Sequence, residues 1–357
     1  MKKYLFIFII ILIFLNSVGS AEEMKPKGSI DINLVGDILL DGTIKKYIEK
    51  EGTEYPWKEA KTYLKKEDLN VGNLECSVTN KGTKWKDKQF NFRMNPEDLQ
   101  GIKDANIELV TLANNHVMDY GYDGLLDTFK YLDSYGIKYT GAGRTKKEAM
   151  NGVVIEKNGV KVGIVAFSRV IPDVKWYATD KRAGIISAYE PYVNEMYKKI
   201  KDMKEKADIV ILSIHWGIER NDIPRKNEIS IARKAIDSGA DIIMGHHPHV
   251  LQGIEIYKGK PIFYSLGNFV FNSRDKLSTK TMIGQVKIVD KKVSEVEVIP
   301  MKIIKSRPIS VTEKEGLGTT NYLNNISKNF NTKILKDGTV KYLKKVGISY
   351  KFQFISL

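Results

Sequence analysis

Cysteine is almost absent from this chain of 357 residues, since Cys76 is its single example. An intrachain disulfide is therefore excluded, and the stability of the fold has to come from a large hydrophobic core. The sequence also lacks internal repeats and low-complexity segments. Only one stretch is long and apolar enough to suggest an interaction with a membrane, and it lies at the N-terminus.

That N-terminal stretch, residues 1–21, has the three parts of a secretory signal. Lys2 and Lys3 form a basic region, residues 4–15 are uninterruptedly apolar, and small residues fill 17–21. The apolar part is shorter than the ~20 residues that a membrane-spanning helix usually needs, which favours cleavage. An uncleaved membrane anchor is the alternative. In either case the rest of the chain is expected outside the cytoplasm, secreted or in a bacterial cell envelope.

The chain has fewer acidic residues than basic ones. The chain has 57 lysines and arginines against 43 aspartates and glutamates, which gives a net charge of +14. Such a balance predicts affinity for polyanions such as teichoic-type phosphates, anionic lipid headgroups or an acidic polymer. A nucleic-acid partner is not expected. The alternative is that lysines spread over the whole sequence only keep the surface solvated.

Histidine is scarce as well, and its distribution is informative. Each of three short clusters follows an apolar run that resembles a strand, and a chain so poor in histidine has none left for ordinary surface roles. Two oxygen-bearing segments, Gly36-Asp37 and Gly72-Asn-Leu-Glu75, occupy the same kind of position. We therefore expect an assembled metal site. The histidines are His116, His215, His246, His247 and His249.

Strand-like runs alternate with amphipathic helices, which predicts an α/β fold. Asn95-Pro96 is expected to open a helix with Asn95 as its cap, and Gly136 to end another. A main domain is predicted over residues 28–305, followed by a lysine-rich extension, 306–357, without an assigned role. Predicted strands are 30–35, 69–72, 108–113, 138–140, 153–156, 161–167, 208–214, 241–244, 261–265 and a hairpin of 282–289 with 293–300.

The metal-site hypothesis rests on where ligand-type residues fall. Asp37, Glu75, Asn115, His215 and the 246–249 cluster all lie near the ends of predicted strands, and ligands gather at the carboxyl ends of strands in α/β sheets. Carboxylate, amide and imidazole together suit Mn²⁺, Fe or Zn²⁺ better than Ca²⁺. Six such groups predict two ions roughly 3.5–4 Å apart that share a carboxylate.

Each of these residues also has a purely structural explanation. Gly36-Asp37 could be a common turn, Asn73 and Glu75 could cap a helix, and His215 could be a buried, hydrogen-bonded histidine. The segment Gly245-His-His-Pro-His249 is different, because three imidazoles within four residues serve little structural purpose. The ordered set is therefore a stronger signal than any of its members.

The ordered motifs resemble the CapA family of bacterial poly-γ-glutamate capsule biosynthesis proteins, which are related to calcineurin-like metallophosphatases. The similarity spans about residues 30–300. It implies a four-layer α/β/β/α sandwich with a binuclear metal centre at one sheet edge. The motifs are Val35-Gly-Asp-Ile-Leu-Leu40, Val71-Gly-Asn-Leu-Glu75, Phe92-Arg93, Leu112-Ala-Asn-Asn-His-Val-Met-Asp119, His215-Trp-Gly217, Gly245-His-His-Pro-His249 and Tyr264-Ser-Leu-Gly-Asn-Phe269.

The resemblance also assigns roles. His116 becomes the catalytic histidine, and Asp119 either orients it or caps the following helix. The implied metal ligands are Asp37, Glu75 (bridging), Asn115, His215, His247 and His249. The residues expected to contact substrate are Arg93, His246, Asn73 and Asn268. Arg93 would clamp a carboxylate or phosphate, with a surface salt bridge as the alternative. His246 would be an outer-shell or substrate group, and Asn268 would shape the floor of the pocket.

Two departures from the phosphatase pattern stand out. Leu39 replaces a histidine of the first motif, which puts the occupancy of one metal subsite in doubt, and the bridging position is a glutamate.

Three functions follow as hypotheses. The first is a metal-dependent hydrolase or transferase that acts in synthesis, release or anchoring of a poly-γ-glutamate-like polymer, alongside capsule-synthesis membrane proteins. The others are a secreted metallophosphoesterase, acting on a phosphate-bearing envelope substrate, and a non-enzymatic polymer-binding or export component.

Overall fold

Two β-sheets carry the fold in the computed structural model, which describes residues 25–343. The predicted signal or anchor at 1–21 lies outside the described residues. Within residues 25–343, no helix combines the length and the apolar character that a membrane crossing requires.

The first sheet has eight strands. Its N-terminal half is parallel and its later strands are antiparallel, so the predicted hairpin pairs with the first strand of the chain. The order is β18 (Arg307–Ser310), β17 (Lys292–Ile304), β16 (Lys280–Val289), β1 (Ile30–Ile38), β2 (Leu69–Leu74), β5 (Ile107–Thr111) and β6 (Lys138–Thr140), with β15 (Asn268–Val270) beside the end of β1.

The second sheet has six strands and a parallel centre. The order is β13 (Ile254–Tyr257), β14 (Lys260–Phe263), β12 (Ile242–His246), β11 (Ile209–His215), β9 (Val160–Ser168) and β8 (Val153–Lys157). Three short pairs stand apart from the two sheets. They are β3 (Ser77–Val78) with β4 (Arg93–Met94), β7 (Ala142–Gly143) with β10 (Gly184–Ile185), and β19 (Thr332–Ile334) with β20 (Val340–Tyr342).

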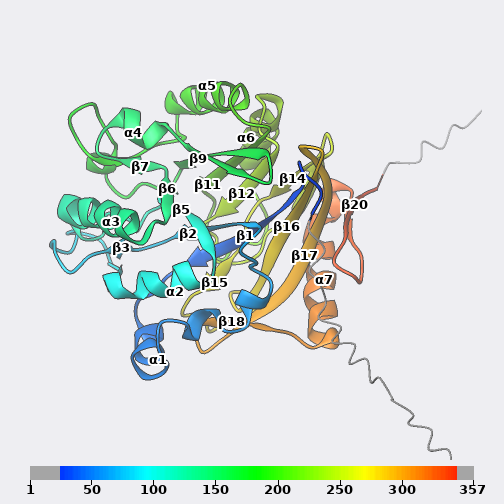
Figure 1. Cartoon of the computed structure of the whole chain (residues 1–357), viewed down its shortest axis with the longest axis horizontal. Coiled ribbons are helices and arrows are strands. Elements are labelled where there is room, and N and C mark those ends of the chain that lie inside the picture. The colour runs from blue at the N-terminus through cyan, green and yellow to red at the C-terminus, as the bar shows by residue number, and fades with distance from the viewer. Residues whose placement is uncertain (1–24, 344–357) are drawn as a thin grey trace, which may run out of the picture.

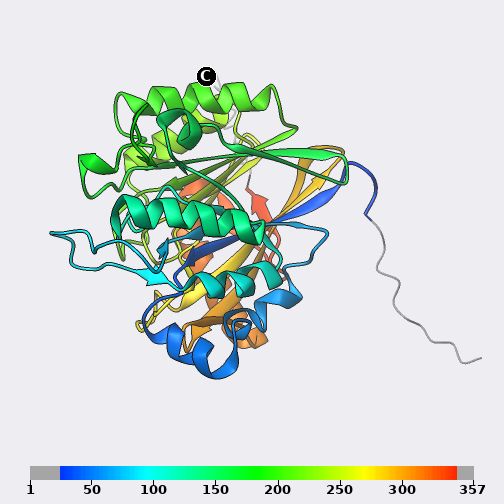
Figure 2. The same ribbon diagram turned by 60° about the vertical axis from the view of Figure 1, so that its left-hand side comes forward.

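The sheets pack face to face, and helices cover their outer faces (Figures 1 and 2). The inner core joins side chains such as Leu34 and Val71 of the first sheet to Ile164 and Ile211 of the second. Helices α1 (Thr43–Glu51), α2 (Leu99–Asp104) and α3 (Gly121–Tyr135) pack on the first sheet, and α5 (Tyr192–Lys204) and α6 (Lys226–Asp237) on the second. The predicted four-layer α/β/β/α sandwich is confirmed.

One predicted helix end is observed in the structure, and one predicted helix cap is not. Gly136 ends α3 in the left-handed conformation, with φ of 72°, as its lack of a Cβ allows. Asn95 does not cap a helix with its side chain. The predicted helix begins instead as a 3₁₀ turn (Pro96–Asp98) before α2, and Asn95 is extended with no capping hydrogen bond.

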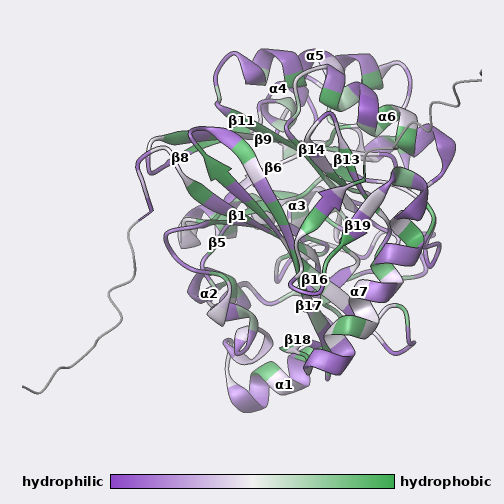
Figure 3. Ribbon diagram, turned by 90° about the vertical axis from the view of Figure 1, so that its right-hand side faces the viewer, coloured by the Kyte–Doolittle hydropathy of each residue, from purple (hydrophilic) through white to green (hydrophobic). Residues whose placement is uncertain are grey.

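The residues described beyond 305 belong to the sandwich. Strand β18 continues the first sheet directly after the turn that follows β17. Helix α7 (Glu313–Ser327) and the β19–β20 hairpin place Leu323, Ile334 and Val340 in the core between the sheets. Figure 3 shows α7 with hydrophilic residues over much of its surface. This part of the predicted extension therefore closes one end of the inner core.

Candidate metal centre

Two glycines allow strands from different parts of the chain to approach at the site. A Cβ on Gly36 would lie 2.0 Å from the carbonyl oxygen of Gly267, and one on Gly245 would lie 2.0 Å from that of Tyr264. Neither contact leaves room for a side chain, so each glycine permits a close backbone crossing. The residue after each glycine, Asp37 or His246, is thereby brought to the site.

The predicted ligands meet at the carboxyl ends of five parallel strands. Asp37 is paired in register with Asn73 on one side and Asn268 on the other, and His215 is paired with His246. Strands β1, β2 and β5 belong to the first sheet, whereas β11 and β12 belong to the second. The site therefore lies where the two sheets meet, as the strand-end argument predicts.

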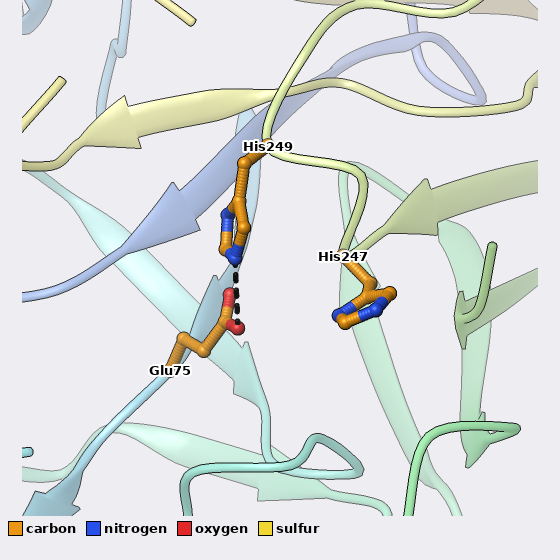
Figure 4. A group of neighbouring side chains, drawn as sticks. All are labelled: Glu75, His247 and His249. Carbon is orange, nitrogen blue, oxygen red and sulfur yellow. Dashed lines mark ion pairs between the residues drawn. The ribbon is translucent and has the colours of Figure 1, made fainter. Parts of the chain in front are cut away.

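Glu75 lies at the centre of the group. Its Oε1 is 3.6 Å from His215 Nε2 and 3.7 Å from His249 Nε2 (Figure 4), and His249 Nδ1 is 3.4 Å from Asp37 Oδ2. Two atoms that each bind one ion at about 2.1 Å lie roughly 3–4 Å apart. These spacings therefore fit shared coordination.

Two overlapping groups of donors result. Glu75, His247 and His249 form one, and Asp37, Glu75 and His215 form the other, each with its ligand atoms within 4.8 Å of one another. Asn115 extends the second group, because its Oδ1 is 2.7 Å from His215 Nε2. Glu75 is common to both groups, which is the position of a bridging ligand.

The donor set fits divalent metal ions, because it leaves buried polar atoms without partners. Among the described residues, no hydrogen bond reaches Asp37 Oδ2, Glu75 Oε1 or His247 Nδ1. A buried polar atom left unpaired typically destabilises a protein by about 1–3 kcal/mol. Ligation of an ion would satisfy such atoms together.

The two buried carboxyl groups differ in charge state without a metal. Burial alone would raise the pKa of Asp37, but a hydrogen bond with His246 and the nearby imidazole of His249 hold it well below its ordinary value. Burial, together with the negative charge of Asp37, raises the pKa of Glu75 well above its own. The metal-free site thus keeps a proton on Glu75 that a bound ion must displace.

The histidines of the metal-free site also differ in charge state. Burial holds the pKa of His215 well below its ordinary range and lowers that of His247 to about 3, so both are neutral and ready to coordinate. Burial would also lower the pKa of His249, but the Asp37 carboxylate, 3.4 Å from its Nδ1, raises it overall.

Metal affinity is therefore expected to rise with pH. Glu75 and His249 both have raised pKa values, above ordinary values of 4.5 and 6.5, and release their protons only above those values. Metal ligands bind in the deprotonated form, so affinity is lost as pH falls through the raised values. Titration calorimetry of Mn²⁺ in buffers of different ionisation enthalpy, from about pH 5.5 to 8, should detect the released protons. A pH-independent affinity would contradict this expectation.

Three residues expected to contact substrate make close polar contacts with the predicted ligands, and one of them, Asn268, also lines the cleft described below. Asn73 is buried, donates to Asp37 Oδ1 (2.9 Å), and accepts from Asn114 (3.1 Å), so no polar atom of it remains for a substrate. His246 is buried as well, with Nδ1 2.9 Å from Asp37 Oδ1, which is the outer-shell option. Asn268 Oδ1 lies 2.8 Å from His249 Nδ1.

Asn268 fixes His249 with its Nε2 toward Glu75. Replacing Asn268 by alanine is expected to weaken metal binding by about 10–100-fold, the usual effect of losing a group that orients a ligand. Asn272→Ala is the matched control, since that exposed asparagine lines the same cleft without a hydrogen bond to any ligand. Equal losses in both variants, measured by competition with a chelating dye, would contradict the assignment.

A histidine–aspartate pair stands beside the ligands. Asp119 Oδ2 is 2.7 Å from His116 Nδ1. Helix α3 has no side-chain cap, so Asp119 orients His116 and does not cap the helix. Lys88 also reaches His116 Nδ1 (2.8 Å) and pairs with Asp119. Burial lowers the pKa of both Lys88 and His116, against the effect of the Asp119 charge.

A cleft of about 400 Å³ opens over the centre. His116, His249 and Asn268 line it, as do Arg220 and Arg274. Arg93 does not line the cleft, because its guanidinium lies over the ring of Tyr120, with 4.6 Å to the ring centroid. It forms no ion pair among the described residues, so neither predicted role of Arg93 is observed.

No sequence pattern pointed to Lys88, Arg220 or Arg274, because each comes from an irregular segment in a chain rich in basic residues. Two aromatic rings were also missed. Phe92 packs on His116, and Phe271 on His249, with ring centroids 4.7 and 4.8 Å apart.

The model of the family described as bacterial capsule synthesis protein PGA_cap matches residues 31–273. The matched range spans β1 to β15 and contains the whole donor set. This chain belongs to that family. The resemblance inferred from the motifs is thereby confirmed.

Capsule proteins of bacilli are among its relatives. The chain is 33% identical to the capsule biosynthesis protein CapA of Bacillus anthracis, over 85% of this chain and 76% of that protein. It is also 33% identical to the PGA biosynthesis protein CapA of Bacillus subtilis strain 168, over 88% and 83%. A solved structure, the NAD nucleotidase of Haemophilus influenzae, is similar at 16% identity with a TM-score of 0.44, covering 84% of this chain and 63% of that one. That likeness is too distant to support a function.

Proposed function

We propose that this PGA_cap protein is a metal-dependent hydrolase or transferase that acts outside the cytoplasm on a poly-γ-glutamate-like polymer. Its task would be synthesis, release or anchoring of a capsule. The observation that carries the proposal is the convergence of buried, unpartnered ligand atoms beside the His116–Asp119 pair, at the floor of a cleft. The names of the two bacillar relatives support the polymer.

The residues present would hold two divalent ions. Glu75, His247 and His249 would hold one, and Asp37, Glu75, Asn115 and His215 would hold the other. Carboxylate, amide and imidazole donors suit Mn²⁺, Fe or Zn²⁺. Bound ions of this kind act as Lewis acids that polarise a scissile carbonyl or phosphoryl group.

The chain's own chemistry then centres on His116. Its Nδ1 is engaged by Asp119 and Lys88, so the ring is fixed and Nε2 remains without a hydrogen bond among the described residues. Imidazole is suited to carry a proton to a leaving group near neutral pH. Phe92, packed on the ring, limits water around it. His116 is therefore assigned the role of general acid.

One observation favours a second candidate, a polymer-binding component without catalysis. Leu39, where metallophosphatases have a ligand histidine, is buried and lines the cleft. Residue 39 therefore supplies no imidazole, and the ion beside Asp37 would be held more weakly.

A parallel assay separates the candidates. Mn²⁺-loaded protein is incubated with poly-γ-glutamate and with a chromogenic phosphate ester, and polymer size, released phosphate and bound metal are measured. Shortened or transferred polymer supports the proposal, and phosphate release alone supports the phosphoesterase alternative. Polymer binding without turnover, with less than one ion per chain, would overturn the proposal in favour of the binding component.

A further inference from the structure

Two arginines line the cleft beside the metal centre, and neither is a predicted metal ligand. Arg220 lies on the loop after β11, and Arg274 on the loop after β15. Both side chains are exposed, and neither forms an ion pair within 4.0 Å among the described residues. Two guanidinium groups are therefore available in the space above His116 and His249.

The carboxylates of the same cleft are mostly occupied. Asp41 pairs with Lys45 (3.0 Å) and accepts the backbone N–H of Arg93 (2.8 Å). Asp275 accepts two backbone N–H groups of its own loop, at 3.0 and 2.9 Å. Only Glu219 has neither a hydrogen bond nor an ion pair within the described part of the chain. The two guanidinium groups are thus the cationic groups of the cleft that no carboxylate pairs with directly.

Arg220 is placed by the ligand segment itself. Its backbone N–H donates to the carbonyl of Pro248 (2.7 Å), between the ligands His247 and His249. Its φ of 61° is in the left-handed region, which non-glycine residues seldom adopt and which is often found at functional sites. This backbone contact fixes the start of the side chain relative to the metal centre.

The rest of the cleft wall is apolar. Phe90 and Phe92 are stacked with their ring centroids 6.1 Å apart, and Phe90 is 57% exposed although it is a large apolar side chain. Phe271 and Leu39 line the cleft as well. Such a surface offers contact to methylene groups, whereas a small phosphate ester would need only the cations.

We propose that Arg220 and Arg274 form a subsite that binds two carboxylates of an acyl polymer on either side of the bond at the metal centre. The phenyl rings of Phe90, Phe92 and Phe271 would contact the methylene groups between those carboxylates. Arginine binds carboxylate through two parallel hydrogen bonds, which gives orientation as well as affinity. This inference deepens the proposed function and rests on it for the position of the scissile bond.

The test measures binding separately from turnover. Affinity of the Mn²⁺-loaded protein for poly-γ-glutamate and for α-linked polyglutamate is measured by calorimetry at ~0.15 M salt, where general attraction to a basic protein is screened. Arg220→Ala/Arg274→Ala is compared with Arg144→Ala/Lys314→Ala. The second pair removes the same charge from exposed positions outside the cleft.

The cleft variant is expected to lose about tenfold in affinity for each arginine, since each loses a charge-assisted pair, while the control stays within about twofold. A greater loss with the γ-linked chain would identify it as the ligand, and an equal loss would extend the subsite to polyglutamate of either linkage. Equal affinity of the cleft variant and the control would overturn the subsite, even if the polymer is still cleaved. Arginine-dependent binding without cleavage would keep the subsite and remove the hydrolase.

Discussion

Replacing Glu75 by glutamine is expected to abolish binding of the metal pair. Glu75 is fully buried, and it is the one residue shared by both donor groups. Glutamine has nearly the same shape but no charge, and one of its two polar atoms cannot coordinate. The loss of affinity should exceed the 10–100-fold that follows when only an orienting group is removed. Elemental analysis after dialysis should give less than one ion per chain.

The same variant separates a lost ligand from a damaged fold. Without metal, burial and the charge of Asp37 raise the pKa of Glu75, so its carboxyl group is protonated and resembles the neutral amide. The metal-free variant should therefore unfold at about the temperature of the metal-free parent. Only the parent should gain stability on adding Mn²⁺, by about 2.7 kcal/mol at a hundred times Kd.

A matched control lies at the rim of the cleft. Glu219→Gln removes one negative charge from an exposed residue that belongs to neither donor group. It should still bind two ions, with only a small change in affinity, because its charge acts on Glu75 and His249 without contributing a ligand. If Glu75→Gln also retained two ions, the central position of Glu75 would be contradicted.

Replacing His116 by alanine should lower kcat by about 10²–10⁴-fold, the usual contribution of a general acid. His116 is not in either donor group, so metal content should remain unchanged. Turnover of polyglutamate or of a chromogenic ester, measured with elemental analysis on the same sample, tests both statements together.

Asp119→Asn completes this series. Asparagine keeps the size of Asp119 but not the charge that pairs with Lys88, and it orients His116 less well. Residues that act as a unit give non-additive effects, so the double variant should be hardly slower than His116→Ala alone. Losses that multiply would show that the two residues act separately. Unchanged turnover in His116→Ala would remove the general acid from the mechanism.

The sequence was most informative where strand periodicity and residue chemistry coincide. Asp37, Glu75, Asn115 and His215 each end a predicted strand, and parallel strands end at a common edge, so their convergence followed from topology. The α/β class followed from the alternation of strand-like runs with amphipathic helices, and the four layers from the resemblance to a known family.

What could not be predicted depends on loop conformation and on which side chains are buried. Lys88 reaches His116 only because its loop folds over Asp119, whose carboxylate accepts the backbone N–H of Phe92 (2.7 Å) and whose carbonyl accepts that of Trp85 (2.8 Å). Asn73 was expected to contact substrate, but the register of β2 against β1 directs its amide to Asp37. No local pattern encodes such cross-chain contacts.

The ligands come from both sheets, and this has a consequence for the stability of the protein. Asp37 and Glu75 follow strands of one sheet, and His215 and His247 follow strands of the other, so an ion between them acts as a clasp at that end of the sandwich. Its strength varies with the free ion concentration around the protein. Removal of metal is therefore expected to make that end of the sandwich easier to unfold.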